Sequence, residues 1–261
     1  PIVFDYAGQD TALVEIKVNN GNPIGNDLIY GEIHGLKKDE DGNALGGALI
    51  GLFKADCTEF TRENAILTAT SAEDGGFSFA DVPYGNWLVR EIKAPTGFVL
   101  SDETFAVTVD KDGAVIEVEI ENTRICGTVQ LTKVDKDYPD NKLTGAEFTV
   151  YRDSNGNKEL DADDELVGTL TETGIGVYEI SDLLYGGYYV KETKAPEGFY
   201  LDGNAYYFEI TEDGKIVTVE NEAGKGFVNA PQVGSLKIIK TSSGGKIEGF
   251  SFRVTGPNGY V

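Results

Sequence analysis

The stretch DVPYGNWLVREIKAPTGFVL at residues 81–100 is followed, 101 residues later, by DLLYGGYYVKETKAPEGFYL at residues 182–201. An Asp, a Tyr-Gly, a Val, a Glu, a Lys-Ala-Pro, a Gly-Phe and a Leu occupy the same positions in both stretches without a gap. A match of this length at one fixed offset indicates an internal repeat of about 100 residues.

Shorter marks show where each repeat begins. A lysine stands six residues after a glycine, and an asparagine stands five residues before that glycine, three times along the chain. The three Asn-Gly-Lys sets are Asn26, Gly31 and Lys37; Asn122, Gly127 and Lys133; and Asn229, Gly234 and Lys240. We therefore expect the last strands of a preceding repeat at 1–29, complete repeats at 30–125 and 126–232, and the start of a further repeat at 233–261.

The pattern inside each repeat is that of β-strands. Residues 114–122 alternate apolar and acidic side chains, as expected for a strand with one buried face. Asp-Gly pairs at 41–42, 112–113 and 213–214 mark tight turns between such segments. About seven short strands per repeat, without helical periodicity, predict an all-β fold of tandem immunoglobulin-like β-sandwiches forming an elongated rod.

Composition excludes several classes of function. The 261 residues carry a net charge of −22, which argues against nucleic-acid binding. The chain has no apolar run long enough to span a bilayer and no signal-peptide pattern at its start. It contains no methionine and begins at Pro1, so we expect it to be a piece of a longer polypeptide. His34 is the only histidine, which leaves no material for a histidine-based triad.

The two cysteines, Cys57 and Cys126, cannot staple the fold as a disulfide framework would. Two alternatives stay open for them, a single disulfide or two free thiols.

Polar residues also occur where the strands should be apolar. In each repeat a lysine near the beginning, a glutamate in the repeated motif and an asparagine in the last strand share the phase of buried neighbours. These residues are Lys37, Glu91 and Asn122 in the first repeat, and Lys133, Glu192 and Asn229 in the second. The phase is weakest for Lys37, because its in-phase neighbours are Ile33 and Gly35.

Burying these groups together has a chemical consequence. Desolvation lowers the pKa of a lysine and raises that of a glutamate, which favours a neutral amine beside a neutral carboxylic acid. The amine is then a nucleophile, and the acid can polarise the asparagine carboxamide and pass a proton to departing ammonia. Glu91 and Glu192 are thus candidate catalysts of Lys37–Asn122 and Lys133–Asn229 isopeptide bonds. The alternative is a hydrogen-bond network that never reacts.

These segments resemble a known family. VKETKAPEGF at 190–199 is similar to the E-box of collagen-adhesin B-type (Cna-B) domains, which have a prealbumin-like fold. LTKVD at 131–135 resembles the first strand of these domains and FVNAP at 227–231 the last. In that family the matching positions carry the isopeptide lysine, the catalytic acid and the isopeptide asparagine. The first repeat departs from the pattern at Ile92 and at Thr123-Arg124. Asn26 and Lys240 match only as half-sites, since neither flanking piece has an E-box.

One acidic loop could bind a metal. Oxygen ligands alternate there as in a calcium loop, at Asp153, Asn155, Asn157 and Asp164. Lys158, however, stands where an EF-hand turn needs glycine. Calcium binding and a solvated acidic turn both stay open, and no other cofactor is expected.

The resemblance implies a structural stalk segment of a Gram-positive pilin or adhesin, at the cell surface and anchored outside this segment. Its partners would be neighbouring repeats of the same polypeptide. It would not be an enzyme, apart from the single-turnover cross-linking. The alternative is an adhesin module that binds a host-surface ligand, with residues 55–64 as the best candidate insertion.

Overall fold

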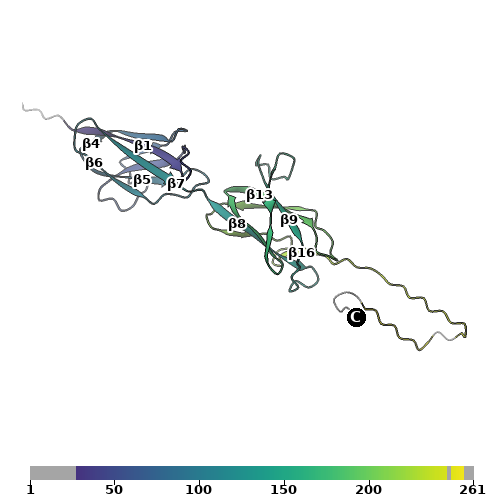
Figure 1. The fold of residues 1–261 in the computed structure, drawn as a ribbon. Helices are drawn as coiled ribbons and strands as arrows, with labels where there is room; N and C mark the ends of the chain where they lie inside the picture. Colours follow the sequence, from purple (N-terminus) through teal and green to yellow (C-terminus); the bar gives the residue numbers. More distant parts are fainter. Residues whose placement is uncertain (1–27, 246–247, 256–261) are drawn as a thin grey trace, which may run out of the picture. The chain divides into compact units, whose positions relative to one another are not determined.

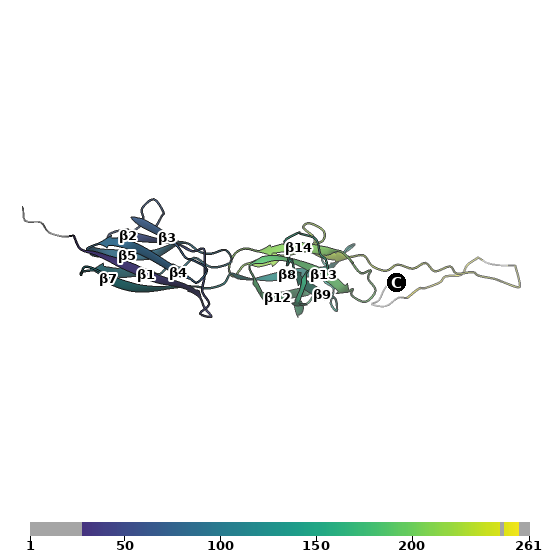
Figure 2. The ribbon, with the colours of Figure 1, turned by 90° about the horizontal axis from the view of Figure 1, so that it is seen from above.

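The computed structural model describes residues 28–245 and 248–255, and these residues form strands and no helix (Figures 1 and 2). They therefore include no helix that could cross a membrane. The chain divides into two compact units. The predicted all-β fold is confirmed.

The first repeat is a sandwich of two sheets, ordered β4-β1-β7 and β3-β2-β5-β6. Its strands are β1 (Tyr30–Asp39), β2 (Leu49–Lys54), β3 (Leu67–Thr70), β4 (Gly76–Pro83), β5 (Gly85–Lys93), β6 (Thr104–Val109) and β7 (Ala114–Asn122). The core between the sheets contains Ile33, Leu52, Val89 and Ile120, all fully buried. Ile33, Val89 and Ile120 alternate with exposed or half-buried residues along their strands, which is the two-residue period of a sheet with one face inward. Leu52 lies in β2, where four consecutive residues are buried.

The second repeat is also a sandwich, with sheets ordered β10-β9-β13-β14 and β11-β12-β8-β15. Strand β16 pairs with β8 as well. The strands are β8 (Cys126–Asp135), β9 (Glu147–Arg152), β10 (Glu165–Thr169), β11 (Thr171–Gly174), β12 (Val177–Leu184), β13 (Gly186–Lys194), β14 (Ala205–Ile210), β15 (Ile216–Thr218) and β16 (Phe227–Asn229).

The first and last strands of each repeat run parallel and side by side. In the first repeat, β1 and β7 pair without a break from Gly31–Ala114 to Asp39–Asn122. In the second repeat the closing strand is interrupted, because residues 220–226 leave the ladder between β15 and β16. Only three residues of β16 then pair with β8, ending at Asn229 and Asp135. The sequence predicted a closing strand here but not its division.

The backbone repeats along with the sequence. The predicted Asp-Gly turns are confirmed by positive φ at Gly42, Gly113 and Gly214. Asp81 and Asp182, which begin the two copies of the motif, both adopt left-handed conformations, with φ of 52° and 59°. Aspartate tolerates this region because its short side chain can hydrogen-bond locally. The same left-handed residue therefore occurs near the end of the strand that precedes the glutamate-bearing strand in both repeats.

Several other expectations concern the ends of the chain and its thiols. Residues 233–245 and 248–255 contain no strand, and the start of a further repeat there stays a prediction. Residues 1–27, with Asn26, lie outside the described residues. Cys57 and Cys126 are both free thiols, the second of the two alternatives.

Gly35 allows Phe77 to cover the inner face of β1. A Cβ added at Gly35 would lie 1.9 Å from the Phe77 ring. We expect Gly35→Ala to push this ring aside and destabilise the first repeat by about 1–3 kcal/mol, as overpacking does. The measurement is the denaturation midpoint of the first repeat. Gly203→Ala is the control and is followed by the midpoint of the second repeat, which contains it, because a Cβ at Gly203 meets open space. Equal shifts of the two midpoints would contradict this interpretation.

Candidate functional site

Each repeat brings its predicted lysine, glutamate and asparagine into one buried cluster. In the first repeat β1 carries Lys37, β5 carries Glu91 and β7 carries Asn122, with exposed fractions of 0%, 1% and 2%. The inward orientation predicted from strand phase is confirmed. It holds for Lys37 as well, because the ring of Phe77 covers the neighbouring Gly35.

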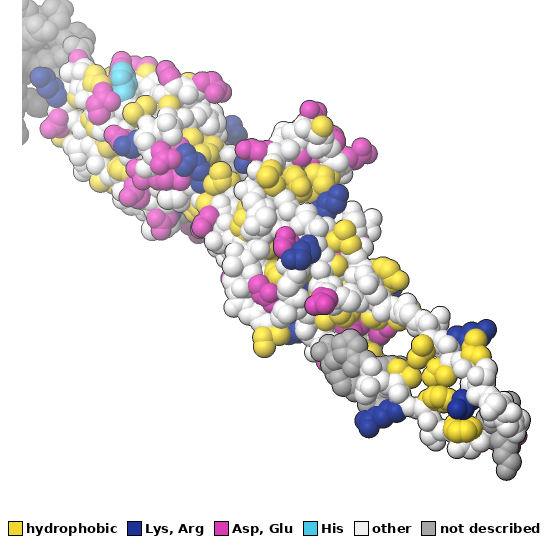
Figure 3. All heavy atoms as spheres, turned by 45° about the vertical axis from the view of Figure 1, so that its right-hand side comes forward, with side chains coloured by type: hydrophobic (Ala, Val, Ile, Leu, Met, Phe, Trp, Pro, Cys, Tyr) yellow, Lys and Arg dark blue, Asp and Glu magenta, His cyan; other side chains and the backbone are white. Residues whose placement is uncertain are grey.

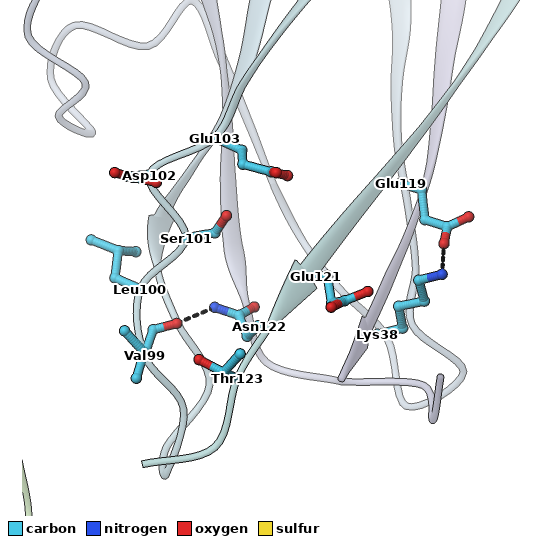
Figure 4. Close-up of a pocket in the computed structure, with 10 residues that line it drawn as sticks. All are labelled: Lys38, Val99, Leu100, Ser101, Asp102, Glu103, Glu119, Glu121, Asn122 and Thr123. Carbon is cyan, nitrogen blue, oxygen red and sulfur yellow. Dashed lines mark hydrogen bonds and ion pairs between the residues drawn. The ribbon is translucent and has the colours of Figure 1, made fainter. Parts of the chain in front are cut away.

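In the first cluster the glutamate lies between the other two groups. Asn122 Nδ2 donates a hydrogen bond to Glu91 Oε2 at 2.7 Å. It also donates to the carbonyl of Val99 at 2.5 Å, a bond drawn in Figure 4. Lys37 Nζ is 3.9 Å from Glu91 Oε1 and donates to the carbonyl of Ile120 at 3.1 Å. The amine is therefore held against the strand that carries the asparagine, two residues before it.

The second cluster has the same arrangement. Asn229 Nδ2 donates to Glu192 Oε1 and Oε2 at 2.8 and 3.0 Å. Lys133 Nζ is 3.8 Å from Glu192 Oε1 and donates to the carbonyl of Phe227 at 2.9 Å. Phe227 again lies two residues before the asparagine. Lys133, Glu192 and Asn229 are as deeply buried as their counterparts.

Burial shifts the ionisation of these groups in the direction that the chemistry needs. Desolvation lowers the pKa of Lys133 to about 8, against the opposing attraction of Glu192 and Asp202. Desolvation likewise lowers the pKa of Lys37, and it raises the pKa of Glu192. Both shifts in the second repeat favour the neutral amine and the neutral acid.

Buried polar atoms without hydrogen-bond partners mark the same two clusters. Among the described residues these atoms include Glu91 Oε1 and the carboxamide oxygens of Asn122 and Asn229. An unsatisfied buried acceptor costs about 1–3 kcal/mol. Rotation of either carboxamide would turn its oxygen toward the glutamate, where a protonated carboxyl group could donate to it.

The loop after each glutamate completes the site, a contribution that the sequence did not predict. The backbone N–H of Ser101 donates to Glu91 Oε2 at 2.8 Å, and that of Asp202 donates to Glu192 Oε2 at 2.8 Å. The same loops bond to the chain just after the asparagines, from Val99 to Thr123 and from Tyr200 to Ala230. The repeated Ala-Pro-X-Gly-Phe sequence preceding these residues was the available signal.

Arg124, where the first repeat departs from the family pattern, forms an ion-pair cluster. Its guanidinium lies 2.5 Å from Asp39, 2.6 Å from Asp41 and 3.1 Å from Glu40. Asp39 is the register partner of Asn122. Arg124 therefore ties the chain leaving the asparagine to the end of β1.

A cavity opens beside each asparagine. In the first repeat its volume is about 470 Å³, and Asn122, Ser101, Glu103 and Glu121 contribute to its lining (Figure 4). In the second repeat a cavity of about 320 Å³ is lined by Asn229, Asp202 and Tyr206 among others. A small molecule released at either asparagine thus has an adjacent space to enter.

The predicted calcium loop is held by its own hydrogen bonds. Oxygens of Asp153, Asn155, Asn157 and Asp164 accept backbone N–H groups within the loop. Asp161 accepts the side-chain amides of Asn155 and Asn157. No cluster of three His, Cys, Asp or Glu side chains suited to a metal occurs in the described part of the chain. A bound calcium ion would have to displace some of these bonds.

The remaining predicted site residue, Lys240, is exposed, and its Nζ lies 4.2 Å from the centre of the Phe250 ring. Acidic side chains are spread over the visible face rather than gathered in one patch (Figure 3). His34 is exposed on β1 and contacts Glu32 at 2.8 Å.

The chain contains two β-sandwich domains, and in each a buried Lys–Glu–Asn cluster lies where the first and last strands meet. This architecture is that of the prealbumin-like β-sandwich proteins. The family model of the SpaA prealbumin-like fold domain matches residues 31–124 and again residues 127–223. The chain belongs to this family. No curated protein matches it.

Solved structures show the same likeness. The Bacillus anthracis TIE protein is 27% identical, with a TM-score of 0.63, over 78% of this chain and 34% of that one. The chain thus spans about a third of the length of that structure. The Streptococcal ancillary pilin is 21% identical (TM-score 0.37; 79% and 64% covered). BcpA, the major pilin subunit of Bacillus cereus, is 16% identical (TM-score 0.31; 77% and 99% covered).

The lowered pKa of Lys133 leads to a prediction for the Asn229→Ala variant, in which this lysine is a free amine. Between pH 8 and 10.5 the unfolded chain retains a lysine proton that the folded repeat has lost. The free energy of unfolding of the second repeat in this variant should therefore rise with pH across this window, by at most about 3 kcal/mol. Denaturant titrations at several pH values measure it. Lys133→Met/Asn229→Ala should lack this rise, and a rise in both proteins would assign it to other groups.

The calcium loop yields a second prediction. If the four loop residues bind calcium, the melting temperature should rise by a few degrees in millimolar calcium and return with chelator, because a ligand of the native state stabilises it. Asp153→Ala should abolish the response. Identical melting curves with calcium and with chelator would identify the loop as a solvated turn.

Proposed function

We propose that this chain is a structural stalk segment of a cell-surface pilin or adhesin, and that each repeat is locked by an autocatalytic Lys–Asn isopeptide bond. The observation that carries the proposal is the buried Lys–Glu–Asn cluster, present in both repeats with the same contacts. Membership in the SpaA prealbumin-like family supports the stalk role.

The reaction joins the lysine amine to the asparagine side chain. The neutral Nζ of Lys133 attacks Cγ of Asn229 while the protonated Glu192 donates to the carboxamide oxygen. The new Nζ–Cγ bond forms, the Cγ–Nδ2 bond breaks, and Nδ2 leaves as ammonia after receiving a proton that the lysine has lost. The glutamate returns to its starting state, so it acts as a proton shuttle. Lys37, Glu91 and Asn122 do the same in the first repeat.

The fold supplies most of what makes amide exchange possible without an enzyme. Amine, acid and amide are held in contact, which removes the entropic cost of bringing them together. Burial excludes water, a competing nucleophile, and the adjacent cavities receive the ammonia. Each site consumes its own lysine and asparagine, so it turns over once and the protein is not an enzyme in the ordinary sense.

The positions of the cross-links suit a load-bearing segment. A bond from Lys37 on β1 to Asn122 on β7 joins the first and last strands of the repeat. Tension along the chain would then pass through the bond instead of the sandwich. Closing a loop of roughly 85 residues also constrains the unfolded chain, worth about 4–5 kcal/mol by analogy with disulfides. Such a bond resists reduction, which suits an extracellular location for a chain whose cysteines are free thiols.

Under the adhesin alternative, residues 55–64 are the candidate insertion, and they contain one aromatic residue, Phe60. Its ring packs edge-on against Phe53 at 5.1 Å and lies 4.7 Å from the Arg90 guanidinium. The loop therefore turns its aromatic side chain toward its own domain, and this observation favours the stalk over the ligand-binding module.

Cross-linking predicts that the intact protein weighs less than its sequence by two molecules of ammonia, one per complete repeat. Mass spectrometry of the purified protein measures this loss, and fragmentation of linked peptides assigns it to Lys37–Asn122 and Lys133–Asn229. A full sequence mass in fresh and aged samples alike would refute the proposal.

Glu192→Gln is the matched variant, because it keeps the size of the side chain but cannot carry the extra proton. It should lose only the ammonia of the first repeat, while Lys133→Ala should give the same mass deficit by removing the nucleophile. If Glu192→Gln still loses two ammonia molecules, Glu192 is not the catalyst.

A further inference from the structure

The two repeats hold their asparagines in place by different means. Asn122 ends a continuous nine-residue ladder with β1, whereas Asn229 ends β16, which contributes only three paired residues. The segment 220–226 separates β16 from the rest of its ladder. At Gly226 the chain returns with φ of 91°, so close to β8 that a Cβ would lie 2.8 Å from the Thr132 carbonyl. Something other than a long ladder must hold Asn229 beside Glu192.

Asn221, in the segment 220–226, replaces part of the strand pairing that this segment interrupts. Its Oδ1 accepts the backbone N–H of Val228 at 2.6 Å, and its Nδ2 donates to the Val228 carbonyl at 2.9 Å. These are the two bonds that a neighbouring strand would make with that residue. Val228 immediately precedes Asn229, so Asn221 fixes the backbone next to the reacting amide.

Asp202 connects this clamp to the glutamate. Its backbone N–H donates to Glu192 Oε2, and its Oδ2 accepts Asn221 Nδ2 at 2.7 Å and Tyr206 Oη–H at 2.6 Å. Tyr206 in turn packs edge-on against Phe227 of β16, with ring centres 5.2 Å apart. Asp202 therefore links Glu192 to β16, the strand that carries Asn229.

The chemistry of Asp202 suits a permanent acceptor. Burial alone would raise its pKa, but hydrogen bonds from Tyr206, Asn221 and Asn204 lower it overall, so the group stays ionised. The equivalent residue of the first repeat is Ser101, which makes the same backbone bond to its glutamate. The carboxylate is thus specific to the repeat whose closing strand is interrupted.

We propose that Asp202, acting through Asn221 and Tyr206, is a positioning residue that holds Asn229 in reach of Lys133 and Glu192 for the second cross-link. The inference rests on the proposed function. Asp202 does not touch the reacting atoms with its side chain. Its carboxylate keeps β16 seated, so the rate of ammonia loss from the second repeat depends on it while that of the first repeat does not.

A charge exchange across the Asp202–Asn221 contact tests this role. Asn221→Asp places two carboxylates against each other and should slow ammonia loss from the second repeat at least tenfold. Asp202→Asn/Asn221→Asp restores a donor–acceptor pair at this contact but not the bond to the Val228 carbonyl, so it should recover a measurable part of the rate. Two substitutions that merely weakened the fold would add their effects instead of cancelling them. Asn204→Ala is the control, because Asn204 bonds Asp202 without reaching β16.

The rates are measured on protein made in a short pulse of cell-free synthesis, acid-quenched at intervals and analysed by mass, with peptides assigning the loss to each repeat. The first repeat is the internal reference. If wild-type protein loses no ammonia from the second repeat, the proposed function fails there. If wild type reacts but Asn221→Asp reacts as fast, or the double variant is as slow as Asn221→Asp, the positioning role is overturned and the proposed function stands.

Discussion

The parallel pairing of the first and last strands is the constraint on which the rest of each repeat depends. It pairs the lysine of the first strand with the residue two positions before the asparagine of the last strand. Lys37 is paired with Ile120, and Lys133 with Phe227. The opposing sheet then adds the glutamate from β5 or β13. A lone buried lysine would be expensive, and the site is stable only because these elements converge on it.

The two repeats solve the same problem with different supporting contacts. The first repeat relies on an unbroken ladder and on Arg124, which ties Asp39, Glu40 and Asp41 to the outgoing chain. The second has a proline where Arg124 stands, and its ladder is interrupted. It uses the carboxylate of Asp202 and the amide of Asn221 instead. The buried chemical groups are identical, while the contacts that orient them are not.

The many carboxylates of the chain fall into two groups, an exposed majority and a small buried set. Most carboxylates are exposed and solvated, and they contribute little to either site. Those that act at the two sites are removed from water and given defined donors, as Glu91, Glu192, Asp202 and Asp39 are. Their effect on the lysines is opposite to that of burial, so desolvation decides the direction in which the pKa of Lys133 moves.

Much of the fold and of the site could be predicted from the sequence alone. The 101-residue offset, the alternation along the strands and the Asp-Gly turns define the repeats, and the phase of Lys133, Glu192 and Asn229 identifies the buried polar groups. These features are local, because a two-residue period and a turn dipeptide express themselves within a few residues.

Only the tertiary structure decided the rest. The loop N–H groups of Ser101 and Asp202, the Arg124 cluster and the Asn221 clamp join residues that are 10 to 85 positions apart in the chain. No periodicity encodes such pairings, since an exposed-looking Asp, Arg or Asn in a turn has the same sequence signature whether or not it meets a partner. The division of the last strand of the second repeat into β15 and β16 escaped prediction for the same reason. The meeting of these groups depends on the closure of the whole sandwich.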